Sequence, residues 1–580
     1  MSASSNSELS PSARSPTLAE ALLDALVARG AKALFALPGD FVVPLLRELR
    51  RLDRLPIHTL AHEPAVGFAA DGAARLGGGL GVACVTFGAG ALNMVNAIAN
   101  AWAEKIPLVV ISGAPGLDER RGRLIHHQVK TLTTQLEVMR AVTLAQAVLD
   151  DPRTALAELD RVLDLARLHS RPVYLEVPRD LVTAICPAPT HTTRHFPPPT
   201  HASSLGVISD RADEAAHHTL ASLAMAKAPL LLIDVELRRF GLEEKAALLA
   251  NRLGLPILTT LSGRGLLAGT GLIGGTWLGR ASEPEIAKSF AQADLILGLG
   301  LLHSDSNLVG HDLDPRVDRR VIDASDGLVR FPDRELPCTL GRFLDALLKQ
   351  ATWQARARMA PLTPQRSHHA TTPGSGPPTP DELGLALAHF VSRHGPFPVV
   401  SDIGDCLFAA LHLHDVEVLA PAYYATVGYG IPAALGAMAV TGRRPLVLIG
   451  DGAFQMTGLE LASAVQLGLD PIVILFDNQG WDMVRAFDAE HPAHSLPQVQ
   501  YELLADSLGC RGHLATDLST FEAALLEAHT ERGRPHLIRV PLAASSRSAG
   551  LTRFVHALSR ANFADSLAKP GCPREKSQGD

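Results

Sequence analysis

The residues Gly450-Asp451-Gly452-Ala453, followed by Asn478 and Gly480, have the types and spacing of a site that joins a divalent cation to a diphosphate. Magnesium prefers oxygen ligands and usually shares its shell between one or two protein groups and phosphate oxygens. Asp451 offers a carboxylate, Asn478 a side-chain carbonyl and Gly480 a backbone carbonyl. Gly-Asp-Gly alone is more typical of an ordinary turn. The prediction of a metal site therefore depends on the second ligand, Asn478.

The elements around these residues predict that they meet. Residues 445–450 form a short apolar run typical of a buried parallel strand, residues 458–469 have helical spacing, and residues 471–476 predict a second strand. In a right-handed strand-helix-strand unit, Asp451 and Asn478 then lie at the carboxyl ends of two parallel strands. Open α/β sheets bind ligands at that edge.

This combination resembles the signature of thiamine diphosphate enzymes. The family usually has two asparagines where this chain has Asp477-Asn478, and only the second is expected to bind metal. The resemblance implies thiamine diphosphate and Mg²⁺ as cofactors, with Asp451, Asn478 and Gly480 as metal ligands. It also implies a diphosphate held at Gly450, Gly452 and Ala453, whose amides open a helix.

A carboxylate for the other end of the cofactor is offered by Glu63, in the sequence Ala-His-Glu-Pro-Ala. By resemblance, this glutamate hydrogen-bonds the aminopyrimidine ring and promotes loss of the proton from the thiazolium carbon. A glutamate in the first turn of a helix, followed by proline, is also favourable for the helix itself. Both interpretations stand at this point.

The loop Ala36-Leu-Pro-Gly-Asp40-Phe41 and the pair His126-His127 resemble those of 2-oxo acid decarboxylases. Two more His-His pairs occur, at 217 and 368, so the pair by itself says little. Its position after the apolar run 107–115 distinguishes it. Histidines titrate near neutral pH, so Asp40, His126 and His127 are candidates to carry protons in catalysis.

The third part of the chain holds further candidates. By resemblance, the Ala425 carbonyl accepts from the cofactor's amino group and Val427 packs between its rings, although Val427 could equally be a core residue at a helix start. Asp405 is expected near the cofactor. Phe408 and Trp481 could line the substrate pocket or belong to the core, as could Phe487.

One departure concerns the substrate. Decarboxylases that act on pyruvate carry a glutamate on the helix after the asparagine loop, where this chain has Val484, and phenylpyruvate decarboxylases place an apolar residue there. Asp482 lies two residues away and so does not share a helix face with Val484. The resemblance therefore implies room for a bulky substrate.

Composition narrows the class of protein. The chain has 580 residues, a hydrophobic content of 47% and a formal net charge of −7, which argues against a nucleic-acid surface. The six cysteines show neither close pairing nor zinc spacing, which favours a reducing compartment. The first seventeen residues lack the apolar core of a signal peptide, and we find no apolar run long enough to span a membrane. These features predict a cytoplasmic protein.

Proline-rich stretches at 187–204 and 361–380 predict two linkers. We expect an α/β fold of three doubly wound domains with mainly parallel sheets. The predicted domains are an aminopyrimidine-binding domain at 18–187, a middle domain at 205–355 and a diphosphate- and Mg²⁺-binding domain at 381–545, with disordered tails at 1–17 and 566–580.

The middle domain could instead bind a dinucleotide, as in flavin-dependent relatives such as acetolactate synthase. Gly298-Leu-Gly300 after a predicted strand is a fragment of the dinucleotide fingerprint without its third glycine. The Asp40 loop and the histidine pair favour a decarboxylase.

The resemblance covers residues 18–545 and implies non-oxidative decarboxylation of an aromatic or long aliphatic 2-oxo acid, such as phenylpyruvate or indolepyruvate, to an aldehyde and CO₂. A carboligase of the acetolactate synthase kind is the alternative enzyme, and a binding or regulatory protein without turnover is the alternative outside enzymes. The resemblance also implies a homodimer with shared active sites, and a homotetramer of such dimers.

Overall fold

The computed structural model describes residues 14–121, 124–187, 210–351, 376–488, 494–543 and 545–568, with side chains described up to residue 560. By its internal contacts the chain divides into two compact units. The first holds the described residues up to 70, together with 78–99 and 107–187. The second holds 71–77, 100–106 and the described residues from 210 onward. The helices α3 (Glu63–Gly77) and α5 (Val95–Ala103) contribute residues to both units.

The first unit is built on a six-stranded sheet in which every pairing is parallel. Buried runs such as Leu108–Ala114 form strands because both faces of a parallel sheet are covered. The strand order is β2 (Ile57–Thr59), β1 (Leu34–Ala36), β3 (Gly81–Val85), β4 (Leu108–Ala114), β6 (Val173–Pro178) and β5 (Ala145–Val148). Its helices are α1 (Leu18–Ala28), α2 (Val43–Leu52), α4 (Ala89–Asn93), α6 (Thr134–Val142) and α7 (Ala155–His169), besides α3 and α5.

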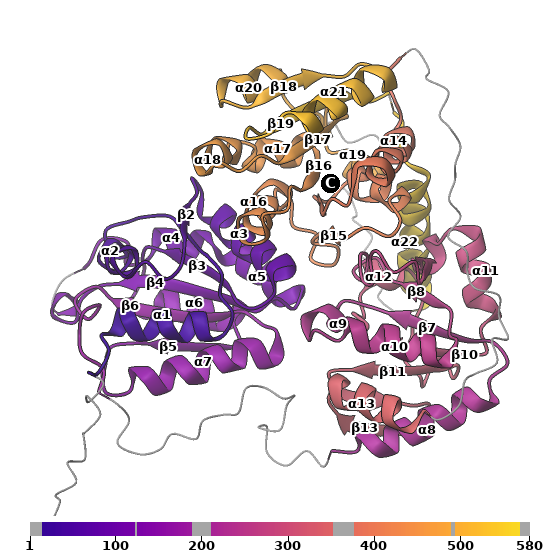
Figure 1. Cartoon of the computed structure of the whole chain (residues 1–580), viewed down its shortest axis with the longest axis horizontal. Helices are drawn as coiled ribbons and strands as arrows, with labels where there is room; N and C mark the ends of the chain where they lie inside the picture. The colour runs from indigo at the N-terminus through magenta and orange to yellow at the C-terminus, as the bar shows by residue number, and fades with distance from the viewer. Residues whose placement is uncertain are drawn as a thin grey trace, which may run out of the picture. The chain divides into compact units, whose positions relative to one another are not determined.

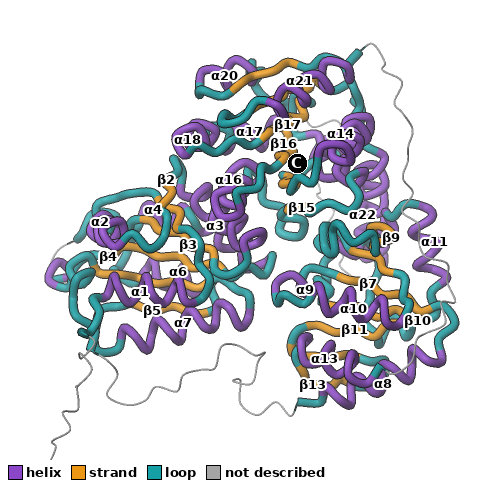
Figure 2. Tube along the Cα trace, viewed as in Figure 1, coloured by secondary structure: helices purple, strands orange, loops and turns teal. Residues whose placement is uncertain are grey.

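The second unit contains two sheets, which can be followed in Figure 1 and Figure 2. One has seven strands, and all its pairings are parallel except the two that β12 makes at one edge. Its order is β13 (Glu335–Cys338), β12 (Gly327–Arg330), β11 (Val321–Ser325), β10 (Leu295–Leu299), β7 (Pro229–Ile233), β8 (Ile257–Thr259) and β9 (Ile273–Thr276). Its helices are α8 (Ala212–Met225), α9 (Glu236–Arg239), α10 (Glu243–Leu253), α11 (Pro284–Gln292), α12 (Asp305–Leu308) and α13 (Leu340–Gln350).

The other sheet of this unit has six strands, all parallel. Its order is β15 (Val418–Leu419), β14 (Val399–Ser401), β16 (Leu446–Gly450), β17 (Ile472–Asp477), β19 (His536–Pro541) and β18 (Arg511–Leu514). Its helices are α14 (Pro380–His394), α15 (Asp405–Ala409), α16 (Gly430–Thr441), α17 (Asp451–Thr457), α18 (Glu460–Leu467), α19 (Asp482–Phe487), α20 (Tyr501–Ser507), α21 (Leu518–Thr530) and α22 (Ala549–Ala568). Three mainly parallel sheets confirm the predicted fold class.

In each sheet the strand order reverses at a switch point near the site residues or near the corresponding loops. The switch lies between β1 and β3 in the first sheet, between β7 and β10 in the second, and between β14 and β16 in the third. At such a point the two loops that follow neighbouring strands diverge and leave a crevice at the carboxyl edge.

The predicted tails differ from the structure at their inner ends. The predicted tail at 1–17 includes Thr17, which forms a capping box with Glu20 at the start of α1. Residues 14–17 are therefore part of the ordered structure. At the other end α22 continues to Ala568, past the predicted start of the tail at 566. The remaining tail residues, and most of the two predicted linkers, lie outside the described residues.

Helix α22 lies beyond the predicted end of the third domain, and its apolar side joins the two sheets of the second unit. Leu551 and Phe554 of this helix pack in one cluster with Leu278 and Val309 of the middle segment and Phe408 of the third. Burying this apolar surface ties the two segments together. Among the described residues, we find no helix both long and apolar enough to cross a membrane.

Candidate active site

The switch point of the first sheet brings together three of the predicted residues. Asp40 follows β1, and its Oδ2 lies 2.7 Å from Nε2 of His126. The guanidinium of Arg179 lies 3.7 Å from the same oxygen and over the ring of Phe41. The His126 ring stacks on Phe41 at 4.8 Å, so an aromatic face and a carboxylate together set its orientation. Sequence analysis missed Arg179, which lies far along the chain after β6.

His127 is oriented by backbone rather than by a carboxylate. Its Nδ1 lies 3.0 Å from the carbonyl oxygen of Phe87, and because a carbonyl only accepts, Nδ1 carries the hydrogen. In the neutral ring Nε2 is then the free acceptor. The backbone of His127 has φ +68° and runs so close to Gly88 that a Cβ there would lie 2.1 Å from the His127 carbonyl oxygen. The absence of a side chain at Gly88 therefore lets this turn form.

Glu63 is the first residue of α3 and is half-buried. Nδ2 of Asn93 donates to its Oε2 at 2.8 Å, and a Cβ at Gly90 would lie 3.5 Å from its Oε1. Asn93 of α4 thus keeps one carboxylate oxygen of Glu63 hydrogen-bonded. Asn93 was not identified from the sequence, because nothing in its spacing relates it to Glu63.

Asp451 begins α17 after β16 and is buried, with 2% of its surface exposed. Its Oδ1 accepts from the amide of Gly452 and its Oδ2 from the amide of Gly480, both at 2.9 Å. Burial, with the charge of Asp477 next in importance, raises the pKa of Asp451 to about 7. A cation beside this carboxylate would favour its ionised form.

The loop after β17 provides a second oxygen at this edge. The side-chain oxygen of Asn478 is buried and makes no hydrogen bond, which is unusual for a buried acceptor. The amide of Gly480 donates to Asp451, so this loop contacts the buried carboxylate. A hard cation would satisfy both an unpaired amide oxygen and a buried carboxylate, and the residues present fit Mg²⁺.

Trp481 packs against the turn at residues 450–453. A Cβ at Gly452 would lie 2.6 Å from the Trp481 ring, so the glycine is required by this contact. Ala453 is buried behind it, and Gly450 has open space around its Cα. Trp481 thus packs on Gly452, a position that the sequence could not reveal.

Asp402 is a further residue that sequence analysis did not single out. It follows β14 across the switch point from Asp451 and is fully buried. Its Oδ1 accepts from the amide of Gly428 at 3.1 Å and its Oδ2 from the amide of Gly430 at 2.8 Å. Burial raises the pKa of Asp402 to about 6. The carboxylate thereby fixes the end of the segment that carries Val427.

That segment holds the two residues expected at the cofactor rings. Ala425 is exposed and Val427 is partly exposed, so Val427 is not a fully buried core residue. Ala425 has φ +59°, a backbone conformation that alanine rarely adopts. Thr457 donates to the Gly428 carbonyl at 2.9 Å and adds a second anchor from α17.

The remaining candidates of this part of the chain differ in exposure. Asp405 accepts from the amide and hydroxyl of Ser548, and burial raises its pKa to about 6. Phe408 is 2% exposed and packs against Phe554 with ring centroids 5.0 Å apart, which favours a packing role. Val484 and Phe487 on α19 are 53% and 46% exposed.

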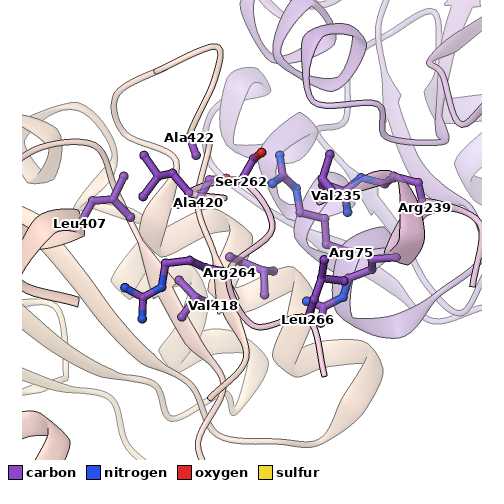
Figure 3. Close-up of a pocket in the computed structure, with 13 residues that line it drawn as sticks. Arg75, Val235, Arg239, Ser262, Arg264, Leu266, Leu407, Val418, Ala420 and Ala422 are labelled. Carbon is purple, nitrogen blue, oxygen red and sulfur yellow. Dashed lines mark hydrogen bonds between the residues drawn. The ribbon is translucent and has the colours of Figure 1, made fainter. Parts of the chain in front are cut away.

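A cavity lies within the second unit (Figure 3). Its lining is rich in guanidinium groups and otherwise mainly apolar: Arg75, Arg238, Arg239, Arg264, Val235, Leu261, Ser262, Leu266, Leu407, Val418, Leu419, Ala420 and Ala422. The predicted site residues are not among those that line it.

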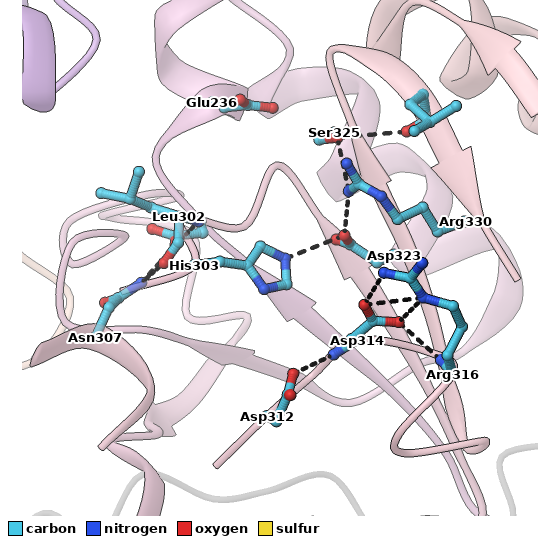
Figure 4. Close-up of polar contacts among 12 residues, drawn as sticks. Glu236, Leu302, His303, Asn307, Asp312, Asp314, Arg316, Asp323, Ser325 and Arg330 are labelled. Atoms are coloured by element: carbon cyan, nitrogen blue, oxygen red, sulfur yellow. Dashed lines mark hydrogen bonds and ion pairs between the residues drawn. The ribbon is translucent and has the colours of Figure 1, made fainter. Parts of the chain in front are cut away.

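The switch point of the middle sheet is filled by the protein's own side chains. Figure 4 shows the Asp323 carboxylate bonded to both His303 and Arg330, each at 3.0 Å. Asp234 is buried and binds the Leu302 amide and the Asn307 side chain, which ties the loop after Gly300 to the sheet. The carboxylates of Asp323 and Asp234, which would be the candidates to hold the ribose of a dinucleotide, are therefore paired internally.

Comparisons with known proteins show the family of this chain. Three family models match: the thiamine pyrophosphate enzyme N-terminal TPP binding domain over residues 16–138, the central domain over 216–325 and the C-terminal TPP binding domain over 402–540. The indole-3-pyruvate decarboxylase of Azospirillum brasilense is 42% identical over 557 residues, which cover 94% of this chain and 99% of that protein.

More distant relatives share the chemistry. A pyruvate decarboxylase of Aspergillus parasiticus is 30% identical, covering 82% of this chain and 84% of its own. An alpha-keto-acid decarboxylase of Mycobacterium avium is 29% identical, covering 91% and 94%. The chain belongs to the thiamine diphosphate-dependent 2-oxo acid decarboxylases.

The contact between Gly88 and His127 can be tested by substitution. We expect Gly88→Ala to lower kcat/KM for the best 2-oxo acid at least about tenfold, because the new methyl group must displace the His127 carbonyl. Gly78→Ala is the matched control, since Gly78 has φ +68° against +67° but nothing within 4 Å of its Cβ position. Equal losses in the two variants would contradict a specific role for the Gly88 contact.

Proposed function

We propose that this enzyme decarboxylates a 2-oxo acid with an aromatic or long aliphatic side chain, such as phenylpyruvate or indolepyruvate, and releases the aldehyde and CO₂. The observation that carries the proposal is the exposed apolar side chain of Val484, on the helix that follows the Asn478 loop. The nearby Asp482 cannot replace the missing glutamate, because it is buried and bonded to Arg547 at 3.1 Å. The name of the Azospirillum relative supports the same class of substrate.

We infer that Asp451, Asn478 and the Gly480 carbonyl bind Mg²⁺, and that Gly450, Gly452 and Ala453 hold the diphosphate. The buried, unbonded oxygen of Asn478 supports this assignment. When bound, thiamine diphosphate accepts the electron pair that is left as CO₂ departs. The chain's own task is to hold the cofactor and substrate and to move protons.

In this proposal Glu63 hydrogen-bonds the aminopyrimidine ring and keeps a proton at one carboxylate oxygen. The other oxygen is occupied by Asn93, which leaves Oε1 for the ring. The Ala425 carbonyl accepts from the amino group, and Val427 packs between the two rings. Asp405 contributes to the cofactor site from α15, where Ser548 fixes its carboxylate.

Asp40, His127 and His126 supply the proton that the product carbon needs before the aldehyde leaves. Asp40 and His126 share a hydrogen bond, so a proton can pass between their facing atoms. His127 presents Nε2, because its Nδ1 is bonded to the Phe87 carbonyl. Trp481 and Val484 are proposed to line the substrate pocket, whereas Phe408 packs against Phe554.

The active form is proposed to be a homodimer with shared sites, in which Glu63 of one subunit serves the metal site of the other, and two such dimers form a tetramer. The family resemblance supports this assembly. The five described cysteines are buried and unpaired, which supports a cytoplasmic enzyme.

Removal of the metal carboxylate tests the cofactor assignment. Asp451→Ala should weaken joint binding of Mg²⁺ and thiamine diphosphate at least about a hundredfold, and ligand-dependent thermal stabilisation should shrink accordingly. Asp470→Ala is the control, since Asp470 is also a buried carboxylate that accepts a backbone amide but lies at the amino end of β17. Parent-like binding by Asp451→Ala would refute the metal assignment.

Shared sites can be tested by complementation. Glu63→Gln and Asp451→Ala chains, each inactive alone, should regain activity when subunits are exchanged, because one of the two shared sites in a mixed dimer is then intact. Assembly of the mixed dimers is checked by mass spectrometry with two differently tagged chains. No recovery in verified mixed dimers would contradict the sharing of sites.

Val484 tests the substrate class. Val484→Glu adds a carboxylate that needs water or a partner, so kcat/KM for phenylpyruvate or indolepyruvate should fall at least about tenfold, or roughly 1.4 kcal/mol, with a smaller loss for pyruvate. Val484→Gln controls for size without charge. If all substrates lose equally, size selection resides elsewhere, for instance near Trp481.

A further inference from the structure

Four polar residues form a buried cluster in the second unit: Asp71, Arg75, Asn100 and Glu104. Asp71 and Arg75 are four residues apart on α3, and Asn100 and Glu104 are four residues apart at the end of α5. Asp71 and Asn100 are fully buried, Glu104 is 1% exposed and Arg75 is 9% exposed. Buried charges are expensive unless they are paired, so the contacts of this cluster call for an explanation.

Part of the explanation is internal pairing. Nε of Arg75 donates to Oδ1 of Asp71 at 2.6 Å, and Nδ2 of Asn100 donates to Oδ2 of Asp71 at 3.1 Å. The Arg75 guanidinium lies 3.7 Å from Oε2 of Glu104. Burial lowers the pKa of Arg75, but the neighbouring carboxylates of Asp71 and Glu104 outweigh this effect and raise the pKa above its ordinary value.

The other side-chain hydrogen bonds of the cluster reach one segment, residues 420–429. Oε1 of Glu104 accepts from two successive amides, those of Tyr423 at 2.8 Å and Tyr424 at 3.0 Å. Arg75 donates to the Ala420 carbonyl at 2.9 Å, and the Tyr429 hydroxyl donates to Asp71 at 2.7 Å. Glu104 therefore holds the middle of the segment, and its neighbours hold the two ends.

The held segment contains an unfavourable backbone conformation. Ala425, next to the two amides bound by Glu104, has φ +59°, and its own amide donates to the Pro421 carbonyl at 2.8 Å. A residue other than glycine stays in this left-handed backbone conformation only when the surrounding structure holds it there. A single carboxylate oxygen that accepts from two consecutive amides is well suited to close such a turn.

The close fit of α3 on α16 makes this arrangement rigid. A Cβ at Gly72 would lie 2.1 Å from the Ala433 carbonyl oxygen, so the two helix backbones touch one turn away from Arg75. Lys105, directly after Glu104, pairs with Glu236 of α9, and Arg239 donates to the Glu104 carbonyl at 3.1 Å. Glu104 is thus held by α3 through Arg75 and by α9 through Arg239.

We propose that Glu104 is a positioning residue for decarboxylation: its buried carboxylate binds the Tyr423 and Tyr424 amides and so sets the turn that presents the Ala425 carbonyl and Val427 to the aminopyrimidine of the cofactor. This inference rests on the proposed roles of Ala425 and Val427. Glu104 itself touches neither substrate nor cofactor and acts through the backbone.

Hydrogen exchange of the cofactor-free protein tests the placement of Glu104 without any turnover. Glu104→Ala should speed amide exchange at Tyr423 and Tyr424 at least about tenfold, because both amides lose their acceptor. Glu104→Gln retains an acceptor oxygen and should give a smaller change. Asp470→Ala, which removes a buried carboxylate from the opposite edge of the sheet, should leave these two amides unchanged.

The loaded enzyme tests the consequence. Glu104→Ala should slow deuterium exchange at the thiazolium carbon of bound thiamine diphosphate at least about tenfold, while the Kd of the cofactor rises less, and Glu104→Gln should restore part of the rate. Unchanged amide exchange, or faster amide exchange with an unchanged thiazolium rate, would overturn the proposal. Failure of the parent enzyme to decarboxylate would instead overturn the proposed function, because the amide measurement does not depend on it.

Discussion

The structure depends on buried carboxylates that accept hydrogen bonds from loop amides at the carboxyl ends of parallel strands. A parallel sheet leaves its loops with amides that no neighbouring strand can bind, and burying them unpaired would be costly. Asp402 binds Gly428 and Gly430, Asp451 binds Gly452 and Gly480, and Asp234 binds Leu302. These carboxylates convert irregular loops into fixed geometry, which is what a cofactor site needs.

The carboxylates at the carboxyl ends of the strands have different environments in the three sheets. In the third sheet the side-chain oxygen of Asn478 is buried and makes no hydrogen bond. An amide oxygen and a buried carboxylate are ligands that suit a hard cation. In the middle sheet the corresponding region is closed by internal pairs, since Asp323 is bonded to His303 and Arg330. In the first sheet Asp40 is left partly exposed and shares its hydrogen bond with His126, which keeps both groups accessible for proton transfer. Thus one fold, used three times, leaves a buried unbonded oxygen in the third sheet, internally paired groups in the middle sheet and an exposed carboxylate–imidazole pair in the first.

Helix α3 has a divided role in this arrangement. Its first residue, Glu63, is the carboxylate proposed for the aminopyrimidine, and its later residues Asp71 and Arg75 anchor the segment around Ala425. Asp71 and Arg75 are four residues apart, so they lie on the same face of the helix. The position of Gly72 against Ala433 explains why no side chain is tolerated midway.

The sequence by itself determined the fold class, the order of the strands that end at Asp451 and Asn478, and the family. Apolar runs, glycine spacing and helix starts are local signals, and they identified the Asp40 loop, Glu63 and the histidine pair. Only the tertiary structure decided which groups orient them: Arg179 beside Asp40, Asn93 on Glu63, the Phe87 carbonyl on His127, and Glu104 on the Tyr423 and Tyr424 amides. These partners are separated from their targets by tens to hundreds of residues, and a hydrogen bond to a backbone amide leaves no pattern in residue types. The chain beyond 545 was missed for a related reason, because α22 is held by packing against Phe408 and Leu278 rather than by a strong local helix signal.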